Sequence, residues 1–163
     1  MRAPFQVLAI PYIKEEGEYK YAIFKRADFK IWQALSGGGE ENETPIEAMR
    51  REIYEEAMID DKAPFIRLAS ATTIPAAYAG GLKWGNEIIM VPEIAFGVEV
   101  SSKDFTISHE HTEYEWLSCK EATEKLKYDS NKSALWELDY RLKNGIDGIE
   151  KNIQLVEKIY SSK

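Results

Sequence analysis

Three glutamates, Glu52, Glu55 and Glu56, have the types and spacing in this chain that most directly indicate chemistry. On a helix that turns ~100° per residue they share one arc. Two unit charges about 5 Å apart cost roughly 3 kcal/mol at an effective dielectric of ~20, so a helix selected only for stability would avoid this spacing. A bound cation would remove the repulsion. Because oxygen ligands suit hard divalent ions, the spacing predicts a Mg²⁺ site, with Mn²⁺ as the alternative ion.

The sequence around these acids predicts a helix with a well-marked start. Thr44 can cap the first turn, Pro45 occupies a position that needs no N–H, and Glu47 lies three residues after the cap. Apolar residues then recur at three- and four-residue spacing, which indicates one buried face; they are Ile46, Met49, Ile53 and Ala57. The alternative interpretation is a solvated, glutamate-rich surface helix.

The stretch from Gly37 to Ile59 resembles the Nudix box, G-x5-E-x7-R-E-U-x-E-E-x-G-U. The matching positions are Gly37, Glu43, Arg51, Glu52, Ile53, Glu55, Glu56 and Ile59. In that family the box forms a loop–helix–loop that binds divalent metal and cleaves a nucleoside diphosphate linked to another group. One position departs, because Met58 replaces the second glycine. A glycine there would end the helix in a left-handed turn that methionine enters at a cost, so we expect a changed helix exit.

The resemblance also implies roles for individual residues. The Gly37 carbonyl and the carboxylates of Glu52, Glu55 and Glu56 would bind metal, and Arg51 would orient the acids. Glu43 could pair with Arg51 and hold the loop against the helix, a structural role. The implied fold is α/β, a Nudix-like α/β/α sandwich with a curved mixed sheet. We expect a single domain over residues 1–163, with helices from about residue 119 onward.

Glu110 is a further candidate outside the box. It precedes an expected short strand that contains Trp116, and in many Nudix hydrolases a glutamate in this place is a metal ligand or base. Glu55 or Glu110 would therefore accept a proton from water. This segment and WQALSGGGEENE resemble the subgroup that hydrolyses dATP and dihydroneopterin triphosphate. His109 and His111 have no third nitrogen or sulfur ligand for zinc, so we expect them to be solvated or hydrogen-bonded.

Four residues are candidates for binding substrate. Arg26 ends an expected strand and could meet a phosphate, with a surface arginine as the alternative. Residues 75–86 form a long glycine-rich excursion, and long loops in compact domains are often functional. There Tyr78 and Trp84 could stack on a base or pterin ring and Lys83 could meet a phosphate. The alternative for the two aromatic residues is a place in the core.

The remaining pattern predicts the elements that position these residues. Strands are expected over 4–13, with Pro11 at a bulge or edge, over 19–24 as the second arm of a hairpin, over 65–74, and over 87–100 with a bend at Pro92. Ser118 and Glu121 form a capping box. Helices are expected over 122–128, 130–143 and 146–160.

Composition narrows the class of protein. A length of 163 residues with 44% hydrophobic content suits one globular domain, and a formal charge of −7 argues against a nucleic-acid polymer as partner. The single cysteine, Cys119, excludes an internal disulfide. No signal-peptide pattern or apolar run of ~20 residues is present, so we expect no membrane association and a cytoplasmic location. Monomer and homodimer both remain open.

These observations predict a Mg²⁺-dependent pyrophosphohydrolase. Its substrate would be a nucleoside or pterin triphosphate, dATP-like, cleaved to a monophosphate and pyrophosphate. The first alternative is a Nudix hydrolase acting on ADP-ribose, a nucleotide sugar or a dinucleoside polyphosphate. The second is a non-catalytic nucleotide-binding module; such modules typically lose the box acids, which this chain keeps.

Overall fold

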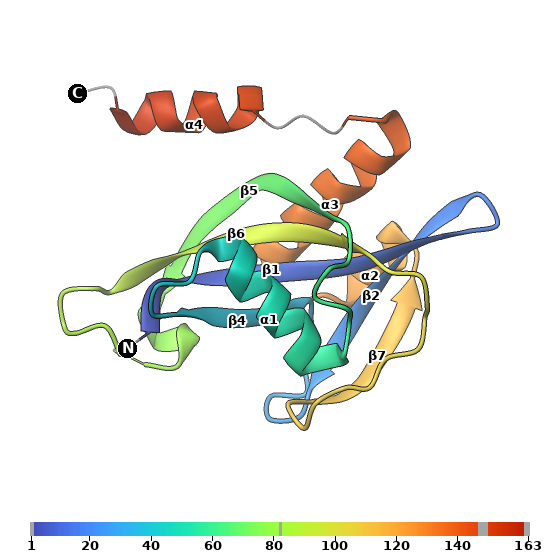
Figure 1. The fold of residues 1–163 in the computed structure, drawn as a ribbon, viewed down its shortest axis with the longest axis horizontal. Coiled ribbons are helices and arrows are strands. Elements are labelled where there is room, and N and C mark those ends of the chain that lie inside the picture. Colours follow the sequence, from blue (N-terminus) through green and yellow to red (C-terminus); the bar gives the residue numbers. More distant parts are fainter. Residues whose placement is uncertain (1, 82, 147–149, 162–163) are drawn as a thin grey trace.

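The computed structural model describes residues 2–81, 83–146 and 150–161. Figure 1 shows a curved sheet with helix α1 in front of it and helices α2 and α3 behind it. The strands are β1 (Arg2–Glu15), β2 (Glu18–Arg26), β3 (Trp32–Gln33), β4 (Leu35–Glu40), β5 (Phe65–Pro75), β6 (Met90–Glu99) and β7 (His111–Leu117). The helices are α1 (Pro45–Ala57), the 3-10 helix η1 (Ala76–Ala79), α2 (Cys119–Lys125), α3 (Asp129–Asn144) and α4 (Glu150–Ser161). The predicted α/β/α sandwich with a mixed sheet is confirmed.

Strand β1 is the centre of the sheet. It pairs with β4 and β2 antiparallel and with β6 parallel, in the order β3-β2-β1-β6-β5. Of the two alternatives expected at Pro11, the bulge is wrong, since Pro11 lies opposite Val98 of β6 in unbroken register and the irregularity falls between Arg2 and Gln6. The edge is present locally, because neither β4 nor β2 pairs with Pro11 on the other side of β1. Pairing with β4 ends at Ala9 and pairing with β2 begins at Tyr12, so the missing N–H of proline falls where β1 changes partner.

Helix α1 begins as the sequence predicts. The Thr44 hydroxyl accepts from the Glu47 backbone N–H at 3.3 Å, and the Glu47 carboxylate accepts from the Thr44 N–H at 2.8 Å. Met49 and Ile53 are fully buried against one face of the sheet. Ile46 belongs to the predicted apolar face but lies in the first turn and is exposed. The capping box and the buried face together fix the helix on the sheet.

The expected change at the helix exit is wrong. Met58 adopts φ 53° and ψ 32°, the left-handed conformation that glycine would take. Its N–H donates to the Tyr54 carbonyl at 2.9 Å, and the Ile59 N–H donates to the Ile53 carbonyl at 3.1 Å. The hydrogen bonds of the exit therefore keep methionine in this conformation, at a cost of roughly 1 kcal/mol.

The opposite face of the sheet is covered by α3. Leu135 and Leu138 pack with Leu8 and Ala95 there. The capping box predicted at Ser118 is present, although α2 begins at Cys119, three residues before its predicted start. Strand β6 begins at Met90, three residues after its predicted start. The bend predicted at Pro92 does not interrupt the pairing, because the register with β5 is continuous there and the irregularity of that pair lies between Arg67 and Ala71 of β5.

Among the described residues, no helix combines the length and the apolar character that crossing a membrane requires.

Candidate active site

Arg51 ties the loop after β4 to helix α1. Its Nε and Nη2 donate to the two carboxylate oxygens of Glu43 at 2.7 and 2.9 Å, and Nη2 also donates to the Gly38 carbonyl at 2.9 Å. These bonds hold the pKa of Glu43 below its usual range, against the opposing effect of burial. The predicted pairing of Glu43 with Arg51 is therefore present, and it anchors the glycine-rich segment on the helix.

Glu52 lies against the backbone of Gly37. A Cβ atom at position 37 would stand 1.9 Å from Cδ of Glu52, so only glycine leaves room for this carboxyl group. Glu52 is 9% exposed, and burial raises its pKa to about 7 even though Arg51 Nη1 donates to it at 2.7 Å. The hydrogen bond from Arg51 therefore does not fully compensate the negative charge of the buried Glu52 carboxylate.

Glu56 is held by Ser108, in the segment before β7, and by His111, the first residue of β7. Its Oε2 accepts from the Ser108 hydroxyl at 2.8 Å and lies 3.0 Å from Nε2 of His111. Burial alone would raise the pKa of Glu56, but the hydrogen bonds from His111 and Ser108 outweigh it and lower the pKa. The prediction that His111 is hydrogen-bonded is confirmed. Its role as a partner of Glu56 was missed, because a pairing over more than fifty residues leaves no periodic signal in the sequence.

Glu55 and Glu110 are both exposed. Glu55 accepts from Arg51 Nη1 at 3.2 Å, so that nitrogen bridges Glu55 and Glu52. Glu110 lies in the turn between Ser108 and His111, where its N–H donates to the Ser108 hydroxyl at 3.3 Å. Ser108 and His111, which stand at the two ends of this turn, both contact Glu56.

The carboxylates of α1 do not converge on one point. In the part of the chain that the structure describes, no group of three or more histidine, cysteine, aspartate or glutamate residues has an arrangement that could hold a metal ion. Arg51 occupies the space between Glu52 and Glu55, and His111 engages Glu56. The donor set still fits a hard divalent cation, because it consists of oxygens, one of them on an under-compensated carboxylate that a glycine cradles.

Arg26 lies beside the Glu110 turn. In the pairing of β2 with β7 it stands opposite His111, and the backbone N–H of Ala27 donates to the Glu110 carbonyl at 2.8 Å. Its guanidinium is engaged by Asp28, with Nε and Nη2 at 2.8 and 2.6 Å from the two carboxylate oxygens. Arg26 is therefore near the acidic site but paired.

The excursion after β5 lies beside the N-terminus, as Figure 1 shows. The indole N–H of Trp84 donates to the Arg2 carbonyl at 2.9 Å, and the ring packs on a small core that includes Ala76. Tyr78 is 79% exposed, and Lys83 is also exposed. No hydrogen bond or ion pair of the described residues joins the predicted substrate residues Tyr78, Lys83 and Trp84 to α1.

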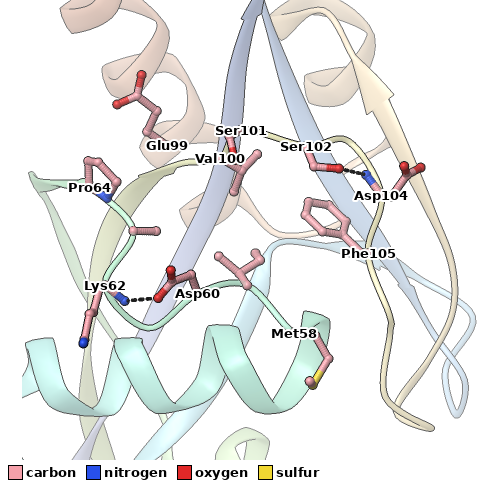
Figure 2. Close-up of a pocket in the computed structure, with 12 residues that line it drawn as sticks. Met58, Asp60, Lys62, Pro64, Glu99, Val100, Ser101, Ser102, Asp104 and Phe105 are labelled. Atoms are coloured by element: carbon pink, nitrogen blue, oxygen red, sulfur yellow. Dashed lines mark hydrogen bonds between the residues drawn. The ribbon is translucent and has the colours of Figure 1, made fainter.

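Two cavities lie outside the group of α1 carboxylates. One of about 480 Å³ lies beneath the exit of α1, where Figure 2 shows Asp60, Lys62 and Phe105 around the hollow; none of the α1 carboxylates lines it. Another of about 320 Å³ lies on the α3 face of the sheet and contains the buried carboxyl group of Glu93. Sequence reasoning missed Glu93, because a lone glutamate in a predicted strand is expected to be exposed.

The sequence of the chain matches a known protein family and a known protein. A profile of the NUDIX domain matches residues 6–137. The chain is 25% identical over 132 residues to dihydroneopterin triphosphate diphosphatase of Haemophilus influenzae, an alignment covering 79% of this chain and 83% of that protein.

Two solved structures show the same architecture. One is a NUDIX hydrolase of Listeria monocytogenes, with 38% identity and a TM-score of 0.79 over 88% of this chain and 97% of that chain. The other is the E. coli dihydroneopterin triphosphate pyrophosphohydrolase, with 23% identity and a TM-score of 0.71 over 86% of this chain and 97% of that chain. At this identity the second likeness concerns the fold alone.

Proposed function

The chain belongs to the NUDIX family and is a hydrolase of phosphoanhydride substrates, and from that premise we propose that it cleaves a pterin or nucleoside triphosphate to a monophosphate and pyrophosphate with Mg²⁺ as cofactor. The observation that carries the metal-dependent part of this proposal is the contact between Gly37 and Glu52. It buries a carboxylate without full charge compensation, next to a backbone segment that Arg51 fixes in place. A divalent cation would supply the missing charge.

In this proposal the Gly37 carbonyl and the carboxylates of Glu52, Glu55, Glu56 and Glu110 would hold the cation. When bound, it supplies neutralisation of phosphate charge and a lowered pKa of water. The residues of the chain do the rest. Arg51 positions the loop and the acids, and His111 fixes the carboxylate of Glu56 through one hydrogen bond.

The reaction breaks one bridging P–O bond. The oxygen of a water molecule attacks phosphorus, its proton passes to Glu55 or Glu110, and pyrophosphate leaves with the electron pair of the broken bond. Both glutamates are exposed and make few contacts, so either carboxylate is free to approach the attacking water. Arg26 would contact a phosphate after release from Asp28. Tyr78 and Trp84 would stack on the base or pterin ring, and Lys83 would contact a phosphate.

A substrate panel tests the proposal. Dihydroneopterin triphosphate, the nucleoside triphosphates, ADP-ribose, a nucleotide sugar and a dinucleoside tetraphosphate are incubated with the protein and Mg²⁺, and phosphate and pyrophosphate are measured separately. We expect pyrophosphate from the triphosphates, and no turnover in excess chelator. Turnover confined to ADP-ribose, the nucleotide sugar or the dinucleoside tetraphosphate would contradict the substrate class while leaving the family assignment in place.

A further inference from the structure

Glu93 is a buried carboxyl group that the proposed reaction does not use. It is 7% exposed and lines the cavity of about 320 Å³ between the sheet and the start of α3. The wall of this cavity contains no lysine or arginine; besides Glu93, its polar residues are Ser70, Thr72, Asp129, Ser130 and Ser133. Buried carboxylates are normally paired with a cation or with several donors. Glu93 therefore needs a different explanation from the surface acids.

A short chain of hydrogen bonds leads to Glu93 and fixes its one hydroxyl partner. The backbone N–H of Ala34 donates to the Asn131 side-chain oxygen at 2.9 Å, and the Asn131 amide donates to the Ser130 hydroxyl oxygen at 3.2 Å. The Ser130 hydroxyl is thereby left to donate its proton to Glu93. Burial raises the pKa of Glu93 in spite of this bond. An ionised carboxylate has about four acceptor positions, so most of its capacity remains unused.

The position of the cavity relates it to the acidic site. Gln6 of β1 stands opposite Glu93 on one side and opposite Gly38 on the other, so these three residues form one row across adjacent strands. With strands about 4.8 Å apart, Glu93 and Gly38 are separated by about 10 Å. The Gly38 carbonyl accepts a hydrogen bond from Arg51, and the backbone of the neighbouring Gly37 contacts the Glu52 carboxyl group. Glu93 faces α3, whereas Glu52 lies on the α1 face of the sheet. A substrate with its ring at Glu93 would therefore carry its phosphates around β4, which among the described strands pairs with β1 alone, to reach α1.

We propose that Glu93 is a specificity-determining residue that binds two adjacent N–H groups on the heterocycle of the substrate, an inference that rests on the proposed triphosphate hydrolysis. The amino group and neighbouring ring N–H of a 2-amino-4-oxopyrimidine present this pair, and pterins and guanine share that edge. Adenine instead presents one donor and one acceptor. Two N–H groups would satisfy the carboxylate with a bidentate, charge-assisted contact in a cavity of ligand-binding size.

The Glu93→Gln substitution tests this inference. Glutamine keeps the shape of the side chain but offers one acceptor and one donor group, which suits adenine better than a pterin. We expect kcat/KM for dihydroneopterin triphosphate and GTP to fall roughly tenfold to hundredfold, and kcat/KM for dATP to stay level or rise. Because the substitution removes a buried ionisable group, the melting temperature should not fall. Glu99→Gln, at an exposed position on the same strand, is the matched control and should leave kcat/KM unchanged for all three substrates.

A binding experiment separates this inference from the hydrolase proposal. Titration calorimetry without metal measures the affinity of dihydroneopterin, guanosine monophosphate and adenosine monophosphate for the wild type, for Glu93→Gln and for a second variant, Glu93→Met. We expect both substitutions to weaken the pterin and guanosine ligands selectively. Binding that depends on Glu93 without any triphosphate hydrolysis would sustain the inference and contradict the function. Equal affinities for pterin and adenine ligands in all three proteins, or no binding of the pterin, would overturn the inference.

Discussion

The backbone of Gly37 lies so close to the carboxyl group of Glu52 that a Cβ atom at position 37 would stand 1.9 Å from Cδ and 2.1 Å from Oε1. The two residues come from β4 and from the middle of α1, and they are brought together by the bonds of Arg51 to Gly38 and Glu43. Glycine is required here for close approach, since the contact leaves no volume for a side chain.

Gly37→Ala should therefore displace Glu52 and weaken metal binding. We expect a reduction of at least tenfold in Mg²⁺ affinity, measured by calorimetry, together with a lower melting temperature. The matched control is Gly38→Ala, because a Cβ there would meet only the flexible end of Arg2 at 3.2 Å. Equal Mg²⁺ affinity in the two variants would contradict the importance of the Gly37 contact.

The pKa of Glu52 predicts that metal binding depends on pH. Burial raises this pKa to about 7, and a carboxylate must be deprotonated to bind a cation. Below pH 7 Glu52 is increasingly protonated, so Mg²⁺ affinity should fall from pH 8 to pH 6. Calorimetry across this range measures the effect. In Glu52→Gln, Mg²⁺ affinity should be weak at both pH 6 and pH 8, and it should change little between them. A pH dependence as steep as that of the wild type would assign the titration to another group.

Glu55→Gln should separate chemistry from stability. Glu55 is exposed and accepts a hydrogen bond from Arg51 at 3.2 Å, so the free energy of unfolding should change by less than about 0.5 kcal/mol. Turnover should fall at least about a hundredfold if Glu55 contacts the metal or the attacking water. Steady-state kinetics at saturating Mg²⁺ and urea unfolding measure the two effects. Glu124→Gln, at an exposed position of α2, is the control; a near-normal rate for Glu55→Gln would falsify the assigned role.

The exit of α1 offers a stabilising substitution. Met58 is half exposed and holds φ 53°, so its side chain contributes little burial while its backbone is strained. Met58→Gly should raise the free energy of unfolding by about 1 kcal/mol. Met58→Ala keeps the strain and should show no gain, which makes it the control in thermal unfolding. Equal stability of the two variants would mean that the left-handed turn costs methionine little.

The sequence by itself determined the catalytic helix and its family. The helix start depends on Thr44, Pro45 and Glu47, which lie within one turn. The family is recognised from residues that lie within about two dozen positions of one another, so both follow from local sequence. The pairing of Glu43 with Arg51 was foreseeable for the same reason, because Glu43 stands just before the capped start of the helix and Arg51 lies about two turns further on.

Only the tertiary structure decided which residues complete the site. Ser108 and His111 reach Glu56 because β7 pairs with β2, and Glu93 enters a cavity because β6 runs beside β1 under α3. The excursion with Tyr78 and Trp84 is anchored at the N-terminus by the Arg2 carbonyl. Contacts between distant strands depend on sheet order and register, and these arise from the packing of the whole core, which no local spacing encodes.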